Sequence, residues 1–259
     1  MSDEVLGVER RDGILVLTMQ RPEARNALND ALRRSLLDAF AGIDPTADRA
    51  VVLRASGPAF CAGADVSGGA PARGHSTLER MRRSTHRLIE EVLACPIPVV
   101  SSVQGACAGF GLALALAADF CVVADDARLI PAFDGLGLAP DGAVAATVVR
   151  AVGLVHARRL LLLGERLSGA RAAEIGLVHA AVGAEELDEA SRELAERLAS
   201  GPTVAYGLTK GMLLRAPQMD IPTLLREERF SQGLLTLTED HLEAAAAFRE
   251  KRRPRFTGR

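Results

Sequence analysis

Aromatic residues are scarce in this chain of 259 residues: they make up 3% of it, with no tryptophan and a single tyrosine. Leucine, valine and alanine must therefore fill most of the core, and a hydrophobic content of 48% supplies enough of them. The net charge of −2 gives no excess of positive charge with which to bind nucleic acid or an acidic membrane surface. We therefore expect no nucleic-acid partner and no membrane partner.

Signals for export, membrane insertion and metal binding are also missing. Residues 1–13 are charged and contain no apolar stretch of the kind found in secretory signals. The longest small apolar run, residues 112–118, is too short to span a bilayer. The five histidines are scattered, without the spacing of metal ligands, so no metal is expected. These features predict a cytoplasmic protein.

The four cysteines show no C-x-x-C spacing and lie in apolar surroundings. In a reducing compartment such residues are typical of buried free thiols. We therefore expect no disulfide among Cys61, Cys95, Cys107 and Cys121.

The hydrophobic pattern predicts an α/β fold. An alternating stretch at residues 14–19 follows the turn residues Asp12-Gly13, which favours a hairpin. Asn29 is placed to cap a helix. Apolar strands are expected at residues 50–53 and 99–103, each followed by small residues and then a helix. This order, strand, small-residue loop and helix, indicates an α/β core with sites at the strand ends.

Two loops of small residues follow these strands. The first is FCAGAD at residues 60–65, and the second is GACAGFG at residues 105–111, which leads into the apolar helix at 112–118. Small residues let backbone N–H groups approach a ligand closely. Two such donors directed at one carbonyl oxygen form an oxyanion hole, which stabilises the charge of an enolate. Chemistry next to an activated carbonyl is therefore the leading interpretation.

Several stretches together resemble the crotonase (enoyl-CoA hydratase/isomerase) superfamily, in the order in which that family has them and over almost the whole chain. They are residues 21–28 (RPEARNAL), 60–65, 105–119, 136–142 (LGLAPDG), 172–178 (AAEIGLV) and 248–252 (FREKR). The resemblance implies an α/β fold with a crotonase-like spiral of ββα repeats over residues 1–195. It also implies a C-terminal helical trimerisation region over residues 196–259.

The same resemblance implies an acyl-CoA thioester as substrate and no cofactor beyond the coenzyme A of that substrate. It implies a homotrimer, or a homohexamer made of two trimers. The backbone N–H groups of Ala64 and Phe110 correspond to the oxyanion donors, although family members usually have glycine at the second position. The implied substrate and CoA contacts are Arg25, Ala62, Gly63, Gly109, Phe133 and Leu136, together with Phe248 and Lys251 from a neighbouring subunit's tail.

Two departures from the family pattern decide the expected chemistry. Family hydratases use two glutamates, and the corresponding positions here hold Ala113 and Phe133. Adding water to a double bond needs groups that activate the water and handle the α-proton, which neither residue can do. Asp141 remains as a carboxylate, in a pattern that resembles the enoyl-CoA isomerase subgroup, where one acid/base suffices. Asp134 ranks lower, because neighbouring side chains on a strand point to opposite faces.

Other interpretations stay open at this stage. Asp141 before a glycine is also typical of a simple helix cap or turn. The chain could catalyse hydration or another crotonase reaction, or bind acyl-CoA without turnover. A nicotinamide dehydrogenase is a further class, but the G-x-G at residues 109–111 lacks the third glycine, since position 114 is leucine.

Overall fold

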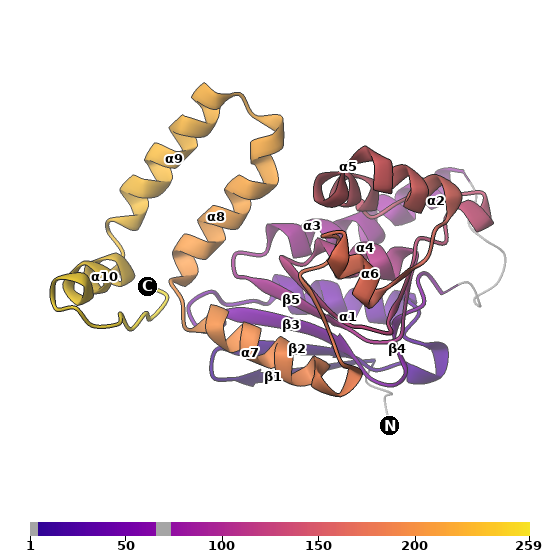
Figure 1. Ribbon diagram of the computed structural model, residues 1–259, viewed down its shortest axis with the longest axis horizontal. Coiled ribbons are helices and arrows are strands. Elements are labelled where there is room, and N and C mark those ends of the chain that lie inside the picture. The colour runs from indigo at the N-terminus through magenta and orange to yellow at the C-terminus, as the bar shows by residue number, and fades with distance from the viewer. Residues whose placement is uncertain (1–4, 66–73) are drawn as a thin grey trace.

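Two sheets contain the strands of the structure, a computed structural model that describes residues 5–65 and 74–259 (Figure 1). Within the described residues, one sheet has six strands in the order β1-β2-β3-β5-β7-β10, and the other has four in the order β4-β6-β8-β9. The strands are β1 (Leu6–Arg11), β2 (Ile14–Met19), β3 (Ala50–Ala55), β4 (Ala59–Cys61), β5 (Val99–Val103), β6 (Ala106–Ala108), β7 (Phe120–Ala124), β8 (Arg128–Ile130), β9 (Leu167–Ser168) and β10 (Ala180–Val182).

Helices connect and cover these sheets. They are α1 (Asp30–Ala41), α2 (His75–Arg80), α3 (His86–Ala94), α4 (Phe110–Ala117), α5 (Val144–Leu163), α6 (Gly169–Glu174), α7 (Leu187–Ala199), α8 (Thr203–Arg215), α9 (Ile221–Leu235) and α10 (Glu239–Arg249). A π-helical turn, Met81–Thr85, joins α2 to α3, so the three form one helical segment that is not uniform.

The chain winds through repeated ββα units. A strand of the large sheet is followed by a short strand of the small sheet and then by helix, as in β3-β4-α2, β5-β6-α4 and β7-β8-α5. The successive strands β3, β5 and β7 pair in parallel, and so do β4, β6 and β8. Each unit therefore adds one strand to each sheet, which confirms the predicted spiral of ββα repeats.

The N-terminal elements confirm the local sequence signals. β1 and β2 pair antiparallel, with positive φ angles of 53° at Asp12 and 77° at Gly13 in the turn between them. The Asn29 side chain accepts a hydrogen bond from the Leu32 N–H at 2.9 Å and caps α1. The three-residue strands β4 and β6 lie where the sequence predicts only loops, because Ala and Cys give too short and too weak an alternation to reveal a strand.

The core lies between the large sheet and the helices that cover it. α7 packs against β3, β5 and β7, and α4 contacts strands of both sheets. All residues of α4 are buried, as expected for a helix that is apolar on every side. The four cysteines are free and buried, as predicted, and burial raises the pKa of Cys61 and of Cys121 to about 12.

Helices α8 to α10 extend away from the sheets, with α8 and α9 side by side (Figure 1). The proposed division between residues 195 and 196 falls inside α7, which covers the large sheet, so the extension itself begins at Thr203. The last residues return to the core, where the Arg49 guanidinium donates to the Phe256 carbonyl oxygen at 3.0 Å. In the part of the chain that the structure describes, no helix has the length and apolar character needed to cross a membrane.

Candidate active site

The first small-residue loop follows β4 and leaves one backbone donor without an acceptor. The Leu28 N–H donates to the Gly63 carbonyl oxygen at 2.8 Å, and the Asp65 N–H donates to the Leu28 carbonyl oxygen at 3.1 Å. These two bonds flank Ala64 and fix its peptide. Among residues 5–65 and 74–259, nothing accepts the Ala64 N–H, so it is available to a ligand.

The second loop supplies a donor at the start of α4. Gly109 has a φ of 51° and donates its N–H to the Ile130 carbonyl oxygen at 2.9 Å. Phe110 is the first residue of α4, where an N–H has no partner inside the helix. Its N–H finds no acceptor in the described parts of the chain. The aligned peptides of α4 add partial positive charge at this end.

The two loops are in direct contact. A Cβ placed on Gly63 would lie 3.0 Å from the Ala108 carbonyl oxygen and 3.7 Å from the Phe110 nitrogen. A Cβ on Gly111 would lie 2.7 Å from the Cys61 Cβ, which real atoms do not reach. Glycine is therefore required where the loops meet. This contact brings the segments that carry the Ala64 and Phe110 donors together, as an oxyanion hole requires.

Asp141 lies on the turn that precedes α5, and this turn packs against α4. Gly142 has a φ of 60°, and a Cβ on it would lie 2.7 Å from the Ala113 Cβ and 3.0 Å from Cε2 of the Phe110 ring. The phenyl ring of Phe110 is buried between the start of α4 and this turn. The turn thus places Asp141 next to the loop that carries the second donor.

The Asp141 carboxyl is partly buried, and one of its two oxygens lacks a partner. Its Oδ1 is buried and makes no hydrogen bond within the described residues. Burial raises the pKa of Asp141, and the charge of His86, at the start of α3, opposes that rise. The alternative role of Asp141 as a helix cap is not supported, because the cap position of α5 is Ala143 and no side chain caps the helix.

The positions of the two missing glutamates are buried and apolar, with Ala113 2% and Phe133 6% exposed. The strand expected around Asp134 is wrong: β8 ends at Ile130, and Asp134 begins a 3₁₀ turn. Because this segment is not a strand, the alternation of side chains along a strand gives no reason to place the Asp134 carboxyl on the opposite face from Phe133. The Asp134 carboxyl instead lies against Gly164, beyond the last turn of α5, and is exposed.

Two of the expected CoA contacts are brought together. The Ala62 N–H donates to the Arg25 carbonyl oxygen at 3.0 Å, which joins the segment before α1 to the first loop. Arg25 has a φ of 49° and an exposed side chain, with no ion pair among the described residues. Its guanidinium is therefore available to an anionic ligand.

Three of the other expected contacts are exposed or lie far from the two loops. Leu136 and its neighbour Leu138 are 68% and 61% exposed, whereas the turn that carries Asp141 packs on buried Phe110 and Ala113. Phe248 is 86% exposed, and with Lys251 it lies at the end of α10. Figure 1 places α10 and β4 at opposite ends of the molecule's long axis, so the chain does not bring these two residues to its own loops.

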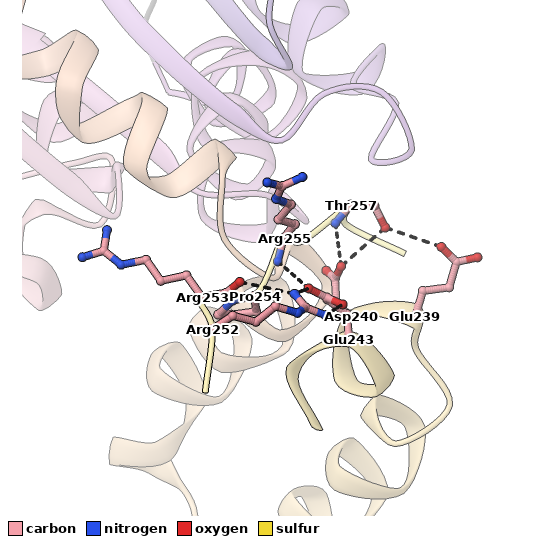
Figure 2. Close-up of a pocket in the computed structure, with 8 residues that line it drawn as sticks. All are labelled: Glu239, Asp240, Glu243, Arg252, Arg253, Pro254, Arg255 and Thr257. Carbon is pink, nitrogen blue, oxygen red and sulfur yellow. Dashed lines mark hydrogen bonds and ion pairs between the residues drawn. The ribbon is translucent and has the colours of Figure 1, made fainter. Parts of the chain in front are cut away.

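A separate cavity of about 730 Å³ lies where the C-terminal segment crosses α10 (Figure 2). Glu243 accepts hydrogen bonds from the Arg252 guanidinium and from the Arg255 N–H, and Asp240 accepts from the Thr257 N–H at 2.6 Å. The Arg252 guanidinium lowers the pKa of Glu243 to about 2. These paired charges attach the tail to α10 and do not resemble a catalytic arrangement.

Comparison with known proteins decides the family. The family model described as "Enoyl-CoA hydratase/isomerase" matches residues 9–259. The chain belongs to the enoyl-CoA hydratase/isomerase family. It is 38% identical over 259 residues to a protein of Rhodobacter capsulatus named "Probable enoyl-CoA hydratase", with 100% of each chain covered.

Two further members show the range of the family. The "1,2-epoxyphenylacetyl-CoA isomerase" of Escherichia coli is 34% identical over 255 residues, which cover 95% of this chain and 96% of the relative. The crystal structure of an enoyl-CoA hydratase from Bacillus anthracis superimposes with a TM-score of 0.93 at 30% identity, covering 99% of this chain and 100% of that chain. The crotonase resemblance and the α/β fold are thus confirmed, whereas hydratase and isomerase names both occur among the relatives.

The sequence interpretation missed two residues near the site. Cys61 was expected only as a buried thiol, yet its Sγ accepts a hydrogen bond from the Gly63 N–H. His86 is one of the scattered histidines to which the sequence gives no role, yet its charge lowers the pKa of Asp141. The position of Cys61 inside FCAGAD is a signal that could have indicated its contact with the loop. No sequence feature links His86 to Asp141, because they come from elements far apart in the chain.

Proposed function

We propose that this protein is an enoyl-CoA isomerase that converts a 3-enoyl-CoA thioester to the 2-enoyl-CoA thioester with Asp141 as the single acid/base. The observation that carries the proposal is the Asp141 carboxyl, whose Oδ1 is buried without a partner on a turn that touches α4 at Phe110 and Ala113. A carboxylate that is partly removed from water is a stronger base than one in water, and burial raises the pKa of Asp141. The name of the Escherichia coli relative, an isomerase of a CoA thioester, also supports it.

In the proposed reaction the Asp141 carboxylate removes a proton from C2 of the substrate. The C2–H electrons form the C1–C2 double bond of a dienolate, and the thioester oxygen takes the negative charge. The Ala64 and Phe110 N–H groups donate hydrogen bonds to that oxygen. The protonated carboxyl then returns the proton to C4, the carbonyl re-forms, and the double bond lies between C2 and C3. No proton is gained or lost overall.

The remaining expectations are part of this proposal. CoA is bound by the exposed guanidinium of Arg25, near the phosphates or the pantetheine, and by Lys251 and Phe248 of a neighbouring chain in a homotrimer or a dimer of trimers. The reaction as written needs no cofactor and no metal, and we expect it to take place in the cytoplasm.

Replacing the proposed acid/base tests the reaction directly. In Asp141→Asn the side chain keeps its size but cannot accept the α-proton, so turnover of a 3-enoyl-CoA should fall about 10²–10⁴-fold. CoA affinity, measured by calorimetry, should stay within about twofold of wild type. Exchange of the α-proton in deuterated water should fall together with product formation. The matched control is Asp134→Asn, which changes an exposed carboxyl against α5 and should leave turnover near wild type.

Three results would contradict the proposal. Full turnover by Asp141→Asn would remove Asp141 from the mechanism. Rapid hydration of a 2-enoyl-CoA by the wild type would favour a hydratase despite the missing glutamates. Binding of a broad acyl-CoA panel without turnover would indicate a protein that retains the fold and the binding site alone.

A further inference from the structure

The Cys61 side chain touches the peptide that carries the first proposed donor. Its Sγ accepts a hydrogen bond from the Gly63 N–H at 3.4 Å and lies 3.9 Å from the Gly63 carbonyl oxygen, a distance at which the thiol donates. The Gly63 carbonyl and the Ala64 N–H belong to one planar peptide unit. The Leu28 N–H donates to the same carbonyl oxygen at 2.8 Å, so the thiol acts with Leu28 in setting the direction of the Ala64 N–H at the other end of this plane.

The same side chain limits the position of the second loop. A Cβ on Gly111 would lie 2.7 Å from the Cys61 Cβ and 2.9 Å from its Sγ, so Cys61 is in contact with the residue that follows Phe110. β4 pairs with β6 through Cys61 and Cys107, and the register shifts between Ala59 and Cys61. Such a bulge redirects the end of a strand. The Cys61 carbonyl oxygen is also in contact at this point, 2.5 Å from the same Cβ position, so the backbone and the side chain at position 61 together limit how closely the end of β4 approaches the start of α4.

The thiol is suited to this role because it is neutral and rigidly packed. Cys61 is completely buried. Burial raises its pKa to about 12, so at neutral pH the sulfur keeps its proton and can both donate and accept. The proposed reaction gives this thiol no chemical step, so its contacts with the two loops have a different purpose.

We propose that Cys61 is a positioning residue that holds the two donor loops at the separation and orientation of a working oxyanion hole. The inference rests on the proposed function only in assuming that the oxyanion hole binds the oxygen of a thioester. It predicts that position 61 affects stabilisation of the thioester oxygen and leaves CoA binding unchanged. Misplacing a reacting group by about 1 Å costs about a hundredfold in rate, so a small displacement of Ala64 or Phe110 is sufficient to be measured.

The experiment compares Cys61→Ala, Cys61→Val and Cys61→Ser with Cys95→Ala. Alanine removes the hydrogen-bonding group, valine adds volume toward Gly111, and serine keeps a group that donates and accepts. Cys95 is a free, buried thiol at the end of α3, so its replacement controls for the loss of a thiol from the core. The probe is butanoyl-CoA labelled with ¹³C at the carbonyl, which has no double bond to move. Infrared difference spectra of its complexes report hydrogen bonding to the thioester oxygen.

In the wild type and Cys95→Ala we expect the carbonyl stretch of bound butanoyl-CoA to move to lower frequency. The shift should be clearly smaller in Cys61→Ala and Cys61→Val, and kcat for a 3-enoyl-CoA should fall about tenfold to a hundredfold, with KM within about twofold. Cys61→Ser should recover most of the carbonyl shift and most of kcat. Thermal unfolding of each variant shows whether it is folded, and Cys61→Ala and Cys61→Ser suffice if valine is not tolerated.

Two outcomes distinguish this inference from the proposed function. A wild-type carbonyl shift and wild-type kcat in folded Cys61→Ala would overturn the role of Cys61 while leaving the isomerase proposal intact. A clear carbonyl shift in a wild type that does not isomerise would overturn the proposed reaction, and the loss of the shift in Cys61→Ala would still establish the positioning role. Absence of any shift in the wild type would overturn both.

Discussion

At the residue scale, the proposed site combines side-chain chemistry from one carboxyl with main-chain chemistry from two peptides. The Ala64 and Phe110 donors do not depend on their side chains, which explains why phenylalanine is compatible with a donor position usually held by glycine. Phe110 has no positive φ, so its side chain causes no backbone strain. Asp141, in contrast, depends on its environment, because burial makes its carboxylate more basic.

The pH dependence of the reaction follows from the environment of Asp141. The carboxyl must be ionised to accept the α-proton, so kcat/KM falls as the pH falls through its pKa. Burial raises that pKa, so the acid limb should lie at higher pH than for an ordinary aspartate. The charge of His86 lowers the pKa of Asp141, so His86→Gln should move the limb to still higher pH.

A pH–rate profile of kcat/KM for the wild type and His86→Gln measures both effects. His241→Gln is the control, since it removes an exposed histidine from α10. An acid limb that stays in place in His86→Gln would show that this histidine does not act on the catalytic carboxyl.

Individual residues also show how much of the site the sequence could predict. The two donors and Asp141 could be predicted because they lie in motifs that are contiguous in the sequence. The absence of glutamate at positions 113 and 133 can be read directly from the sequence. The contact of Cys61 with Gly111 and the effect of His86 on Asp141 arise from packing between distant segments. No periodicity or spacing encodes such contacts.

At the scale of elements, the site is built where short strands end and α4 begins. β4 and β6 are three residues long, and their sequences, AFC and ACA, have no alternation of apolar and polar residues from which to predict a strand. The longer strands β3 and β5 were predictable because each begins with consecutive apolar residues, AVVL in β3 and VV in β5, as is typical of parallel strands buried on both faces. The turn before α5 completes the site, and glycine allows its close approach to α4.

Gly142→Ala tests the importance of that close approach. The added Cβ would overlap Ala113 and approach the Phe110 ring, so the turn must move and carry Asp141 with it. We expect kcat to fall about a hundredfold, since misplacement by about 1 Å has an effect of that size. The positive φ should also cost about 1 kcal/mol or more of unfolding free energy.

Gly137→Ala is a matched control for this substitution. Gly137 has a similar φ of 65°, but a Cβ there meets nothing within 4 Å. Gly137→Ala should therefore lose a similar free energy of unfolding, measured in urea, while keeping the kcat of the wild type. Equal losses of kcat in the two variants would show that backbone strain, and not the contact with α4, explains the effect.

At the scale of the whole molecule, the C-terminal extension carries Phe248 and Lys251 away from Arg25 and Ala62, although all four residues are expected to bind the same CoA. Large apolar side chains are exposed along α8 to α10, which favours their burial in an assembly (among them Leu213, Ile221, Phe230, Leu237 and Phe248). The tail holds α10 in place, because Asp240 is 4% exposed and accepts the Gly258 N–H at 3.0 Å. The helical character of this region was predictable from its sequence, whereas its direction away from the sheets was not, since only tertiary contacts fix it.

The final prediction concerns which chain supplies Lys251 to the site. Removing one charge that contacts a CoA phosphate should raise KM about tenfold in Lys251→Ala, with kcat unchanged. Arg253→Ala is the control on the same tail, because the Arg253 side chain extends away from its neighbours in Figure 2. Co-expression of Lys251→Ala chains with inactive Asp141→Asn chains, each with its own affinity tag, then gives mixed oligomers for kinetic analysis.

If neighbouring chains share each site, some sites in the mixed oligomers combine Asp141 of one variant with Lys251 of the other. Those sites carry neither defect, so a component with the KM of the wild type should appear. If both residues came from the same chain, every site would carry one defect and no such component could form. The extended position of α10, at the far end of the molecule from β4, favours the shared site. A mixed oligomer that shows only the raised KM of Lys251→Ala would therefore refute the shared site, whatever the outcome at Asp141.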